Sequence, residues 1–98
     1  MTQNTTNIDP DAVPLIPRGV RLHDDKVRGK MVLLAPERVI DLDPIGLAIV
    51  QQIDGHKSMT TIIGHLATLY DAPAVQIADD VQAYISGLLD RRILELSA

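Results

Sequence analysis

Histidine and acidic side chains are the groups in this sequence that have the chemistry to hold a metal ion or to move a proton. The three histidines, His23, His56 and His65, lie far apart. No two of them have the i, i+4 spacing that places a pair of zinc ligands on one face of a helix. We therefore interpret all three as exposed polar residues and predict no metal site.

The acidic residues form two adjacent pairs, Asp24–Asp25 and Asp79–Asp80. Neighbouring residues on a helix do not face each other, so Asp79 and Asp80 make a poor acid–base pair and are interpreted as a solvated surface. Asp24–Asp25 is interpreted as part of a turn.

Other catalytic chemistry finds no support in the residue types or their spacing. The chain has no cysteine, which excludes disulfides, thiolate metal sites, iron–sulfur clusters and thiol nucleophiles. Its six glycines are scattered, so no phosphate-binding or dinucleotide-binding loop can be formed. No hydroxyl group has a recognisable activating base beside it. The sequence predicts a binding module with no catalytic residue and no cofactor.

Length and composition indicate one small domain. The chain has 98 residues, of which 46% are apolar, and its only aromatic residues are two tyrosines, so the core must be aliphatic. The net charge of −4 disfavours unaided binding to nucleic acid or to an anionic membrane. No apolar run approaches the roughly 20 residues of a membrane span, and the first residues are polar, so we expect a cytoplasmic protein.

The N-terminal half predicts a tail followed by a small antiparallel sheet. Residues 1–13 are rich in Thr, Asn and Asp and predict a disordered tail, leaving residues 14–98 as the single domain. Alternation at residues 20–23, an apolar run at 31–34 and a second run at 39–42 predict three short strands, the last two joined by a turn at Pro36.

The C-terminal half has helical periodicity. Asp43 followed by Pro44 is typical of a helix start, and Gly55 ends that helix. Ser58 caps a second predicted helix, and Pro73 opens a longer third one. The predicted fold class is therefore α+β and winged-helix-like, a three-stranded antiparallel sheet followed by three helices.

A winged-helix arrangement favours DNA binding, but the third predicted helix argues against it. Between residues 74 and 90 it carries Asp79, Asp80 and Asp90 and no basic residue. Phosphates would repel such a helix. A winged-helix regulator that binds DNA or a protein partner is the alternative function.

The outer edge of the predicted sheet is the most informative binding feature. If the strands lie in sequence order, residues 38–42 form an edge with unpaired backbone groups, and an extended peptide can add there as a fourth strand. The third helix would form the other wall of a groove. The pattern alone favours a covered edge instead: a short or twisted one, or one covered by the tail or by a second copy of the chain, as in an edge-paired homodimer.

Several segments, in order, resemble the PqqD family, the accessory proteins of pyrroloquinoline quinone (PQQ) biosynthesis. They are Pro17–Leu22, Val32–Glu37, Val39–Asp43, Ile53–Gly55, Ile62–Tyr70, and Asp80–Val81 with Leu88–Leu89. The resemblance covers about residues 14–96. The segment 56–59 and the pair Arg91–Arg92 depart from the family pattern.

The resemblance implies a peptide chaperone. Members of the family bind the ribosomal precursor peptide PqqA and present it to the radical SAM enzyme PqqE, which links a Glu and a Tyr side chain of the peptide. Related domains recognise leader peptides in other pathways of peptide modification. In the family the peptide lies against the third strand and the third helix. The implied contact residues are Arg38, Val39, Ile40, Asp41, Leu42, Ala78, Val81, Gln82, Ile85 and Leu89, although part of the helical set must face the protein's own core.

Overall fold

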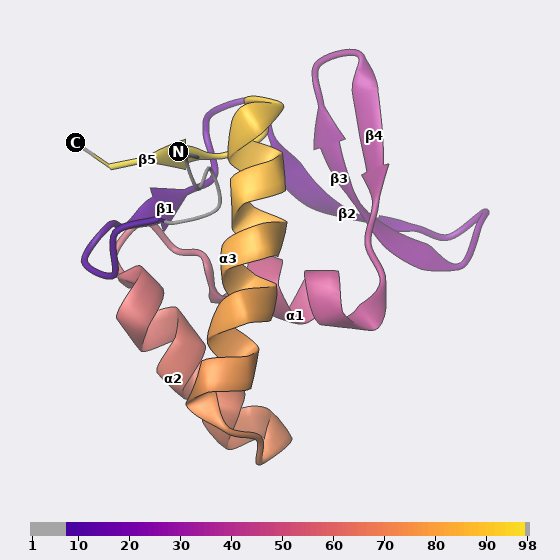
Figure 1. Cartoon of the computed structure of the whole chain (residues 1–98). Helices are drawn as coiled ribbons and strands as arrows, with labels where there is room; N and C mark the ends of the chain where they lie inside the picture. The colour runs from indigo at the N-terminus through magenta and orange to yellow at the C-terminus, as the bar shows by residue number, and fades with distance from the viewer. Residues whose placement is uncertain (1–7, 98) are drawn as a thin grey trace.

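The computed structural model describes residues 8–97 and has two small sheets and three helices (Figure 1). The elements in order are β1 (Pro14–Leu15), β2 (Arg21–Asp25), β3 (Lys30–Ala35), β4 (Arg38–Asp41), α1 (Pro44–Gln52), α2 (Met59–Tyr70), α3 (Ala74–Asp90) and β5 (Glu95–Leu96). The predicted fold class is confirmed: an antiparallel sheet of order β2-β3-β4 precedes three helices. Among the described helices, none has the length and apolarity to cross a membrane.

The β3–β4 hairpin is held in register by the alternating burial of β4 and by a tight turn. Leu33 of β3 is fully buried and lies opposite Ile40 of β4, which packs against the core. The turn between β3 and β4 is Pro36–Glu37, and Glu37 has a φ of 62°. Proline followed by a residue of positive φ is the pattern of a type II turn. The predicted hairpin is therefore present.

The helices begin where the sequence places capping side chains. The Asp43 carboxylate accepts a hydrogen bond from the Gly46 N–H at 2.6 Å, with Pro44 as the first helical residue of α1. The Ser58 hydroxyl accepts one from the Thr61 N–H at 3.2 Å at the start of α2. Aliphatic side chains of the three helices and of β3 then form one core, completed by Ile93 and Leu94.

The N-terminal segment differs from the predicted tail. Ile8 is only 8% exposed and belongs to the core, and the Gln82 side chain of α3 bonds both of its backbone groups, at 2.6 Å and 2.8 Å. The first N–H groups of α2 are also engaged: Met59 donates to the Ala12 carbonyl and Thr60 to the Pro10 carbonyl. Residues 8–13 are thus packed because they cap α2 and complete the core. Residues 1–7 lie outside the described residues.

A second, two-stranded sheet joins the two ends of the domain. β1 pairs antiparallel with β5, Pro14 opposite Leu96. Figure 1 shows this pair on one side of α3 and the three-stranded sheet on the other. Because Ile93 and Leu94 are buried, the short apolar stretch after α3 is docked onto the domain. α3 therefore has one side committed to the chain's own termini.

Candidate functional site

In the described part of the chain, residues 8–97, the outer edge of β4 carries unpaired backbone groups at two positions. The Leu42 N–H donates to the Met31 carbonyl at 3.3 Å. Bonded and non-bonded pairs alternate along an antiparallel ladder, so Val39 and Asp41 fall at the non-bonded positions, and their N–H and C=O groups point away from β3. The remaining bonded pairs are Leu33–Ile40 and Ala35–Arg38.

The side chains of this strand divide between the two faces of the sheet. Ile40 packs against the core and Leu42 is 8% exposed, whereas Val39 is 52% exposed. Asp41 is exposed and forms ion pairs with Arg28 and Lys30. The segment 38–42 is therefore held to the core by its side chains, and the outward N–H and C=O groups of Val39 and Asp41 can pair with another strand.

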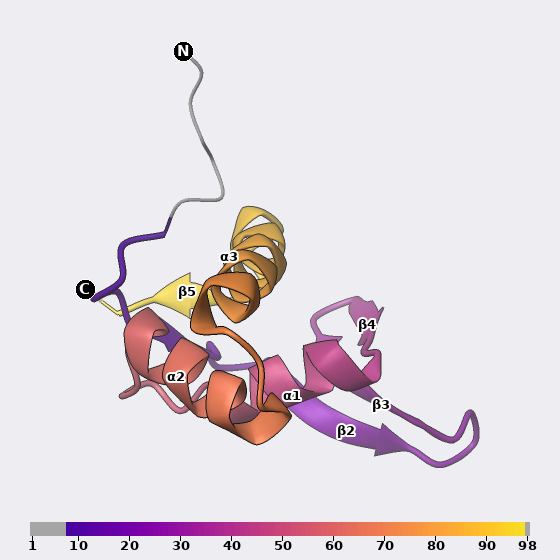
Figure 2. The same cartoon turned by 60° about the horizontal axis from the view of Figure 1, so that its bottom comes forward.

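One face of α3 borders the same side of the molecule as this edge. Asp80, Tyr84, Gly87 and Arg91 follow at spacings of three or four residues and share that face. In Figure 2, β4 lies uppermost of the three strands, and its free edge and α3 border one side. Arg38 joins the two, since its Nη2 donates to the Arg91 carbonyl at 2.7 Å. We call the outer edge of β4 and this face of α3 the two walls of a candidate groove.

A close contact between α1 and α3 lies at this face of α3. A Cβ added at Gly46 would lie 2.5 Å from the Tyr84 hydroxyl, so only a glycine lets the ring lie against the helix in this position. Burial raises the pKa of Tyr84, and the Asp43 carboxylate raises it further against the opposing effect of Arg91. Beside this contact is a shallow hollow lined by Asp43, Ile45, Ile49, Asp80, Ala83 and Tyr84.

The structure places most of the predicted residues of α3 against its own core or beside other elements, while Val81 also lines a hollow between the helices. Val81 and Ile85 are buried in the core, at 1% and 0% exposure. Gln82 bonds Ile8, and Ala78 lines a hollow between α2 and α3. Leu89 is half-buried against the core.

The residues of α3 that line the shallow hollow, Asp80, Ala83 and Tyr84, lie outside the predicted set because they are mixed in type. The predicted set followed the apolar stripe, which is the face that a helix turns to its own core. The signal available in the sequence was the adjacent face, on which Asp80, Ala83, Tyr84 and Gly87 recur at helical spacing.

The groups that this candidate site offers are outward backbone groups of β4 and a partly apolar hollow. Within residues 8–97, no group of three or more His, Cys, Asp or Glu side chains is placed to hold a metal ion. The three histidines stay apart, and the His65 ring contacts the Gln52 side chain at 3.2 Å. An open strand edge beside a helix is the arrangement in which an extended peptide adds to a sheet.

Fold and site together define a winged-helix-like α+β domain with an open strand edge facing a helix. The comparison with known families assigns it more closely. The family model described as Coenzyme PQQ synthesis protein D (PqqD) matches residues 30–94, and the chain belongs to this family.

The relatives agree along nearly the whole chain. The PqqA binding protein of Rhizobium meliloti (strain 1021) is 45% identical over 96 residues, which cover 98% of both chains. The bifunctional coenzyme PQQ synthesis protein C/D of Methylorubrum extorquens is 42% identical over 94 residues, which are 96% of this chain and 25% of that protein.

Two solved structures are similar. One is the solution NMR structure of the PqqD truncation of Methylobacterium extorquens PqqCD, described as a functional and stand-alone recognition element for ribosomally synthesized and post-translationally modified peptides. It has a TM-score of 0.78 at 42% identity and covers 93% of this chain and 97% of that one. The crystal structure of PqqD from Xanthomonas campestris has a TM-score of 0.58 at 42% identity, covering 91% and 99%.

Proposed function

We propose that this protein is the peptide chaperone of PQQ biosynthesis. It binds the precursor peptide PqqA as a strand added to β4 and presents it to the radical SAM enzyme PqqE. The single observation that carries the proposal is the outward direction of the Val39 and Asp41 backbone groups beside α3. The names of the relatives support PqqA as the ligand.

The proposed binding mode follows from the geometry of the edge. Val39 and Asp41 each offer one N–H and one C=O to an incoming strand. Each hydrogen bond formed there contributes about 1 kcal/mol net, which is too little for specificity by itself. Side chains of the peptide that reach the α1–α3 hollow would supply the rest of the affinity and the choice of sequence.

On this proposal the protein holds and positions the peptide but catalyses nothing itself. Presentation to an enzyme is supported by the bifunctional relative, in which a PqqD domain is fused to another protein of the same synthesis. The place of action is the cytoplasm, where a ribosomal peptide is made. An edge-paired homodimer would use the same groups of β4, so peptide binding and such a dimer would exclude each other.

The test is a calorimetric titration of the folded protein with synthetic PqqA, with a scrambled peptide as control. We expect saturable one-to-one binding of PqqA only. Adding PqqE to the protein–peptide complex should then give a ternary complex in sedimentation experiments. If a protein with a native circular dichroism spectrum does not bind PqqA, the chaperone function is refuted. If PqqA binds but no ternary complex forms, only the presentation to PqqE is refuted.

A further inference from the structure

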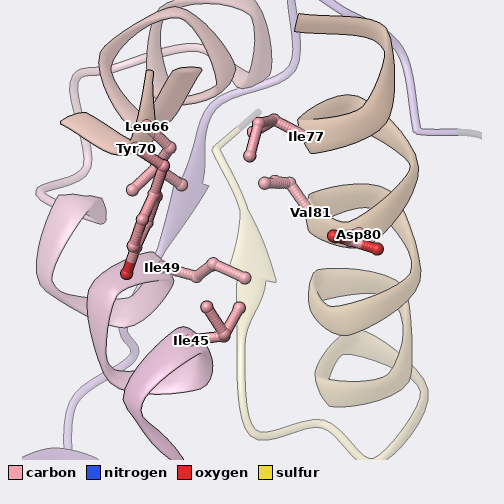
Figure 3. A pocket seen from close by; sticks show the side chains of 7 residues that line it. All are labelled: Ile45, Ile49, Leu66, Tyr70, Ile77, Asp80 and Val81. Atoms are coloured by element: carbon pink, nitrogen blue, oxygen red, sulfur yellow. The ribbon is translucent and has the colours of Figure 1, made fainter. Parts of the chain in front are cut away.

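A second, more enclosed hollow lies between all three helices (Figure 3). It offers about 60 Å³, several times the roughly 10–15 Å³ that one water needs. Its floor is fully buried and aliphatic, formed by Ile49, Leu66 and Val81 at exposures of 1%, 2% and 1%. Figure 3 shows Ile49 and Val81 pointing toward each other from α1 and α3, with the Tyr70 ring along one side.

The rim of this hollow is exposed although much of it is apolar. Ile45 is 47% exposed and Tyr70 is 42% exposed, and the third rim residue, Asp80, is charged and exposed. Large apolar side chains gathered on a surface around a concavity are typical of a binding site.

The enclosed hollow continues the candidate groove. Ile45, Ile49 and Asp80 line both this hollow and the shallow hollow beside Tyr84. Ile45 also follows Asp41, the last residue of β4, by only four positions. A peptide paired with β4 that runs on past Asp41 would come to the start of α1, where Ile45 borders both hollows.

The charged residues that line the two hollows have one sign. Asp43 and Asp80 line the two hollows, and no Lys, Arg or His side chain of the described residues lines either of them. The Asp43 carboxylate already accepts the Gly46 N–H, which fixes its position. Two carboxylates beside apolar walls complement a cation rather than an acidic residue.

We infer that the enclosed hollow is a specificity subsite for the bound peptide: it takes one apolar side chain that stands next to a lysine or arginine, whose charge lies by Asp80. This inference rests on the proposed function. It adds the chemical type of the peptide residues that the protein selects next to the part paired with β4. It predicts that a peptide with an acidic residue in that position is rejected by like-charge repulsion.

The test uses two matched pairs of variants in the PqqA titration. Tyr70→Ala removes one wall of the hollow, and its control Leu69→Ala removes an exposed neighbour on α2 that does not line it. Asp80→Lys reverses the charge at the rim, and its control Asp79→Lys reverses one that lines neither hollow. We expect affinity to fall about tenfold for Tyr70→Ala and about three- to tenfold for Asp80→Lys, with both controls within about twofold of the wild type.

A double-mutant cycle then identifies the partner of Asp80. Each Lys and Arg of the peptide is replaced in turn by Gln and titrated against the wild type and Asp80→Asn. One replacement should lose its effect in the Asp80→Asn background.

Three outcomes separate the inference from the proposed function. If the wild type binds PqqA and both test variants bind like their controls, the subsite is wrong and the strand-addition mode stands. Coupling to no basic residue would overturn the charge preference. If the wild type does not bind PqqA, both the proposed function and the subsite fail.

Discussion

The side chain of Arg38, at the start of β4, is bonded to the backbone of Arg91, at the end of α3, with Nη2 and the carbonyl oxygen 2.7 Å apart. The two residues are 53 positions apart in the chain. A cation at this point also suits the negative end of the helix. The bond sets the separation of the two walls of the candidate groove at one end.

Replacing Arg38 tests whether this bond positions the groove. Arg38→Ala should lower the free energy of unfolding by less than about 1 kcal/mol, because the bond is exposed. PqqA affinity should fall more than stability, since the wall spacing is no longer fixed. Urea unfolding and calorimetry measure the two effects, with the exposed Arg21→Ala on β2 as control. Unchanged affinity would show that the bond plays no part in positioning.

Proline substitutions test strand addition at β4. Val39→Pro removes one outward N–H and leaves the β3–β4 ladder intact, so the protein should fold and lose most of its PqqA affinity. Asp41→Pro should act similarly, although it also removes the ion pairs with Arg28 and Lys30.

The opposite edge of the same sheet supplies the control for these prolines. His23 pairs with Val32 at a bonded position, which leaves the Asp24 N–H pointing outward from β2. Asp24→Pro should therefore fold and bind PqqA normally. Equal losses from Val39→Pro and Asp24→Pro would contradict binding at β4.

Alanine substitution of two helical glycines should have different effects, lowering PqqA affinity in one case and raising stability in the other. In Gly46→Ala the new Cβ forces the Tyr84 ring away from α1, which changes the shallow hollow beside Tyr84 and should weaken PqqA binding. In Gly64→Ala the new Cβ points into open space, so the higher helix propensity should stabilise the fold by about 0.5–1 kcal/mol. Thermal unfolding and calorimetry compare them. Normal PqqA affinity of Gly46→Ala would exclude Tyr84 from the binding surface.

The Gln82–Ile8 contact predicts that the segment at residues 8–13 stabilises the domain. Gln82→Ala leaves the partly buried N–H and C=O of Ile8 without this partner and should cost about 1–3 kcal/mol. Gln76→Ala, at an exposed position of the same helix, should change little. Deleting residues 1–13 should cost more, because Ile8 also leaves the core. Unfolding midpoints in urea that do not shift would mean that the segment acts as a tail.

Asp54 gives the domain a dependence of stability on acid pH. The N–H of Lys57 first, and that of His56 second, donate to its carboxylate and hold the pKa of Asp54 well below its usual range. A depressed folded pKa stabilises the fold above the unfolded value of about 4, and this contribution is lost as pH falls through the folded pKa.

Asp54→Asn should therefore flatten the stability curve below about pH 4. Unfolding followed between neutral and strongly acid pH measures it, with the exposed Asp79→Asn as control. An unchanged acid slope in Asp54→Asn would assign the pH dependence to other groups.

The sequence by itself determined the fold class and the place of residues 38–42 at an edge of the sheet. Asp43 with Pro44 and Ser58 start the helices at the predicted positions, because a cap acts within one turn of chain. The alternation of an outward Val39 with an inward Ile40 likewise follows from the strand alone, because successive side chains of a strand point to opposite faces. The PqqD family assignment follows from the same local segments in order.

Only the tertiary structure decided which groups of the site face outward. The outward direction of Val39 and Asp41 depends on register with β3, which no single strand specifies. The apolar stripe of α3 turned out to be core, and Gln82 binds Ile8, a residue 74 positions away. Contacts between residues so far apart in the chain depend on how the elements pack together. The polar N-terminal sequence therefore has no local feature that marks residues 8–13 as part of the domain.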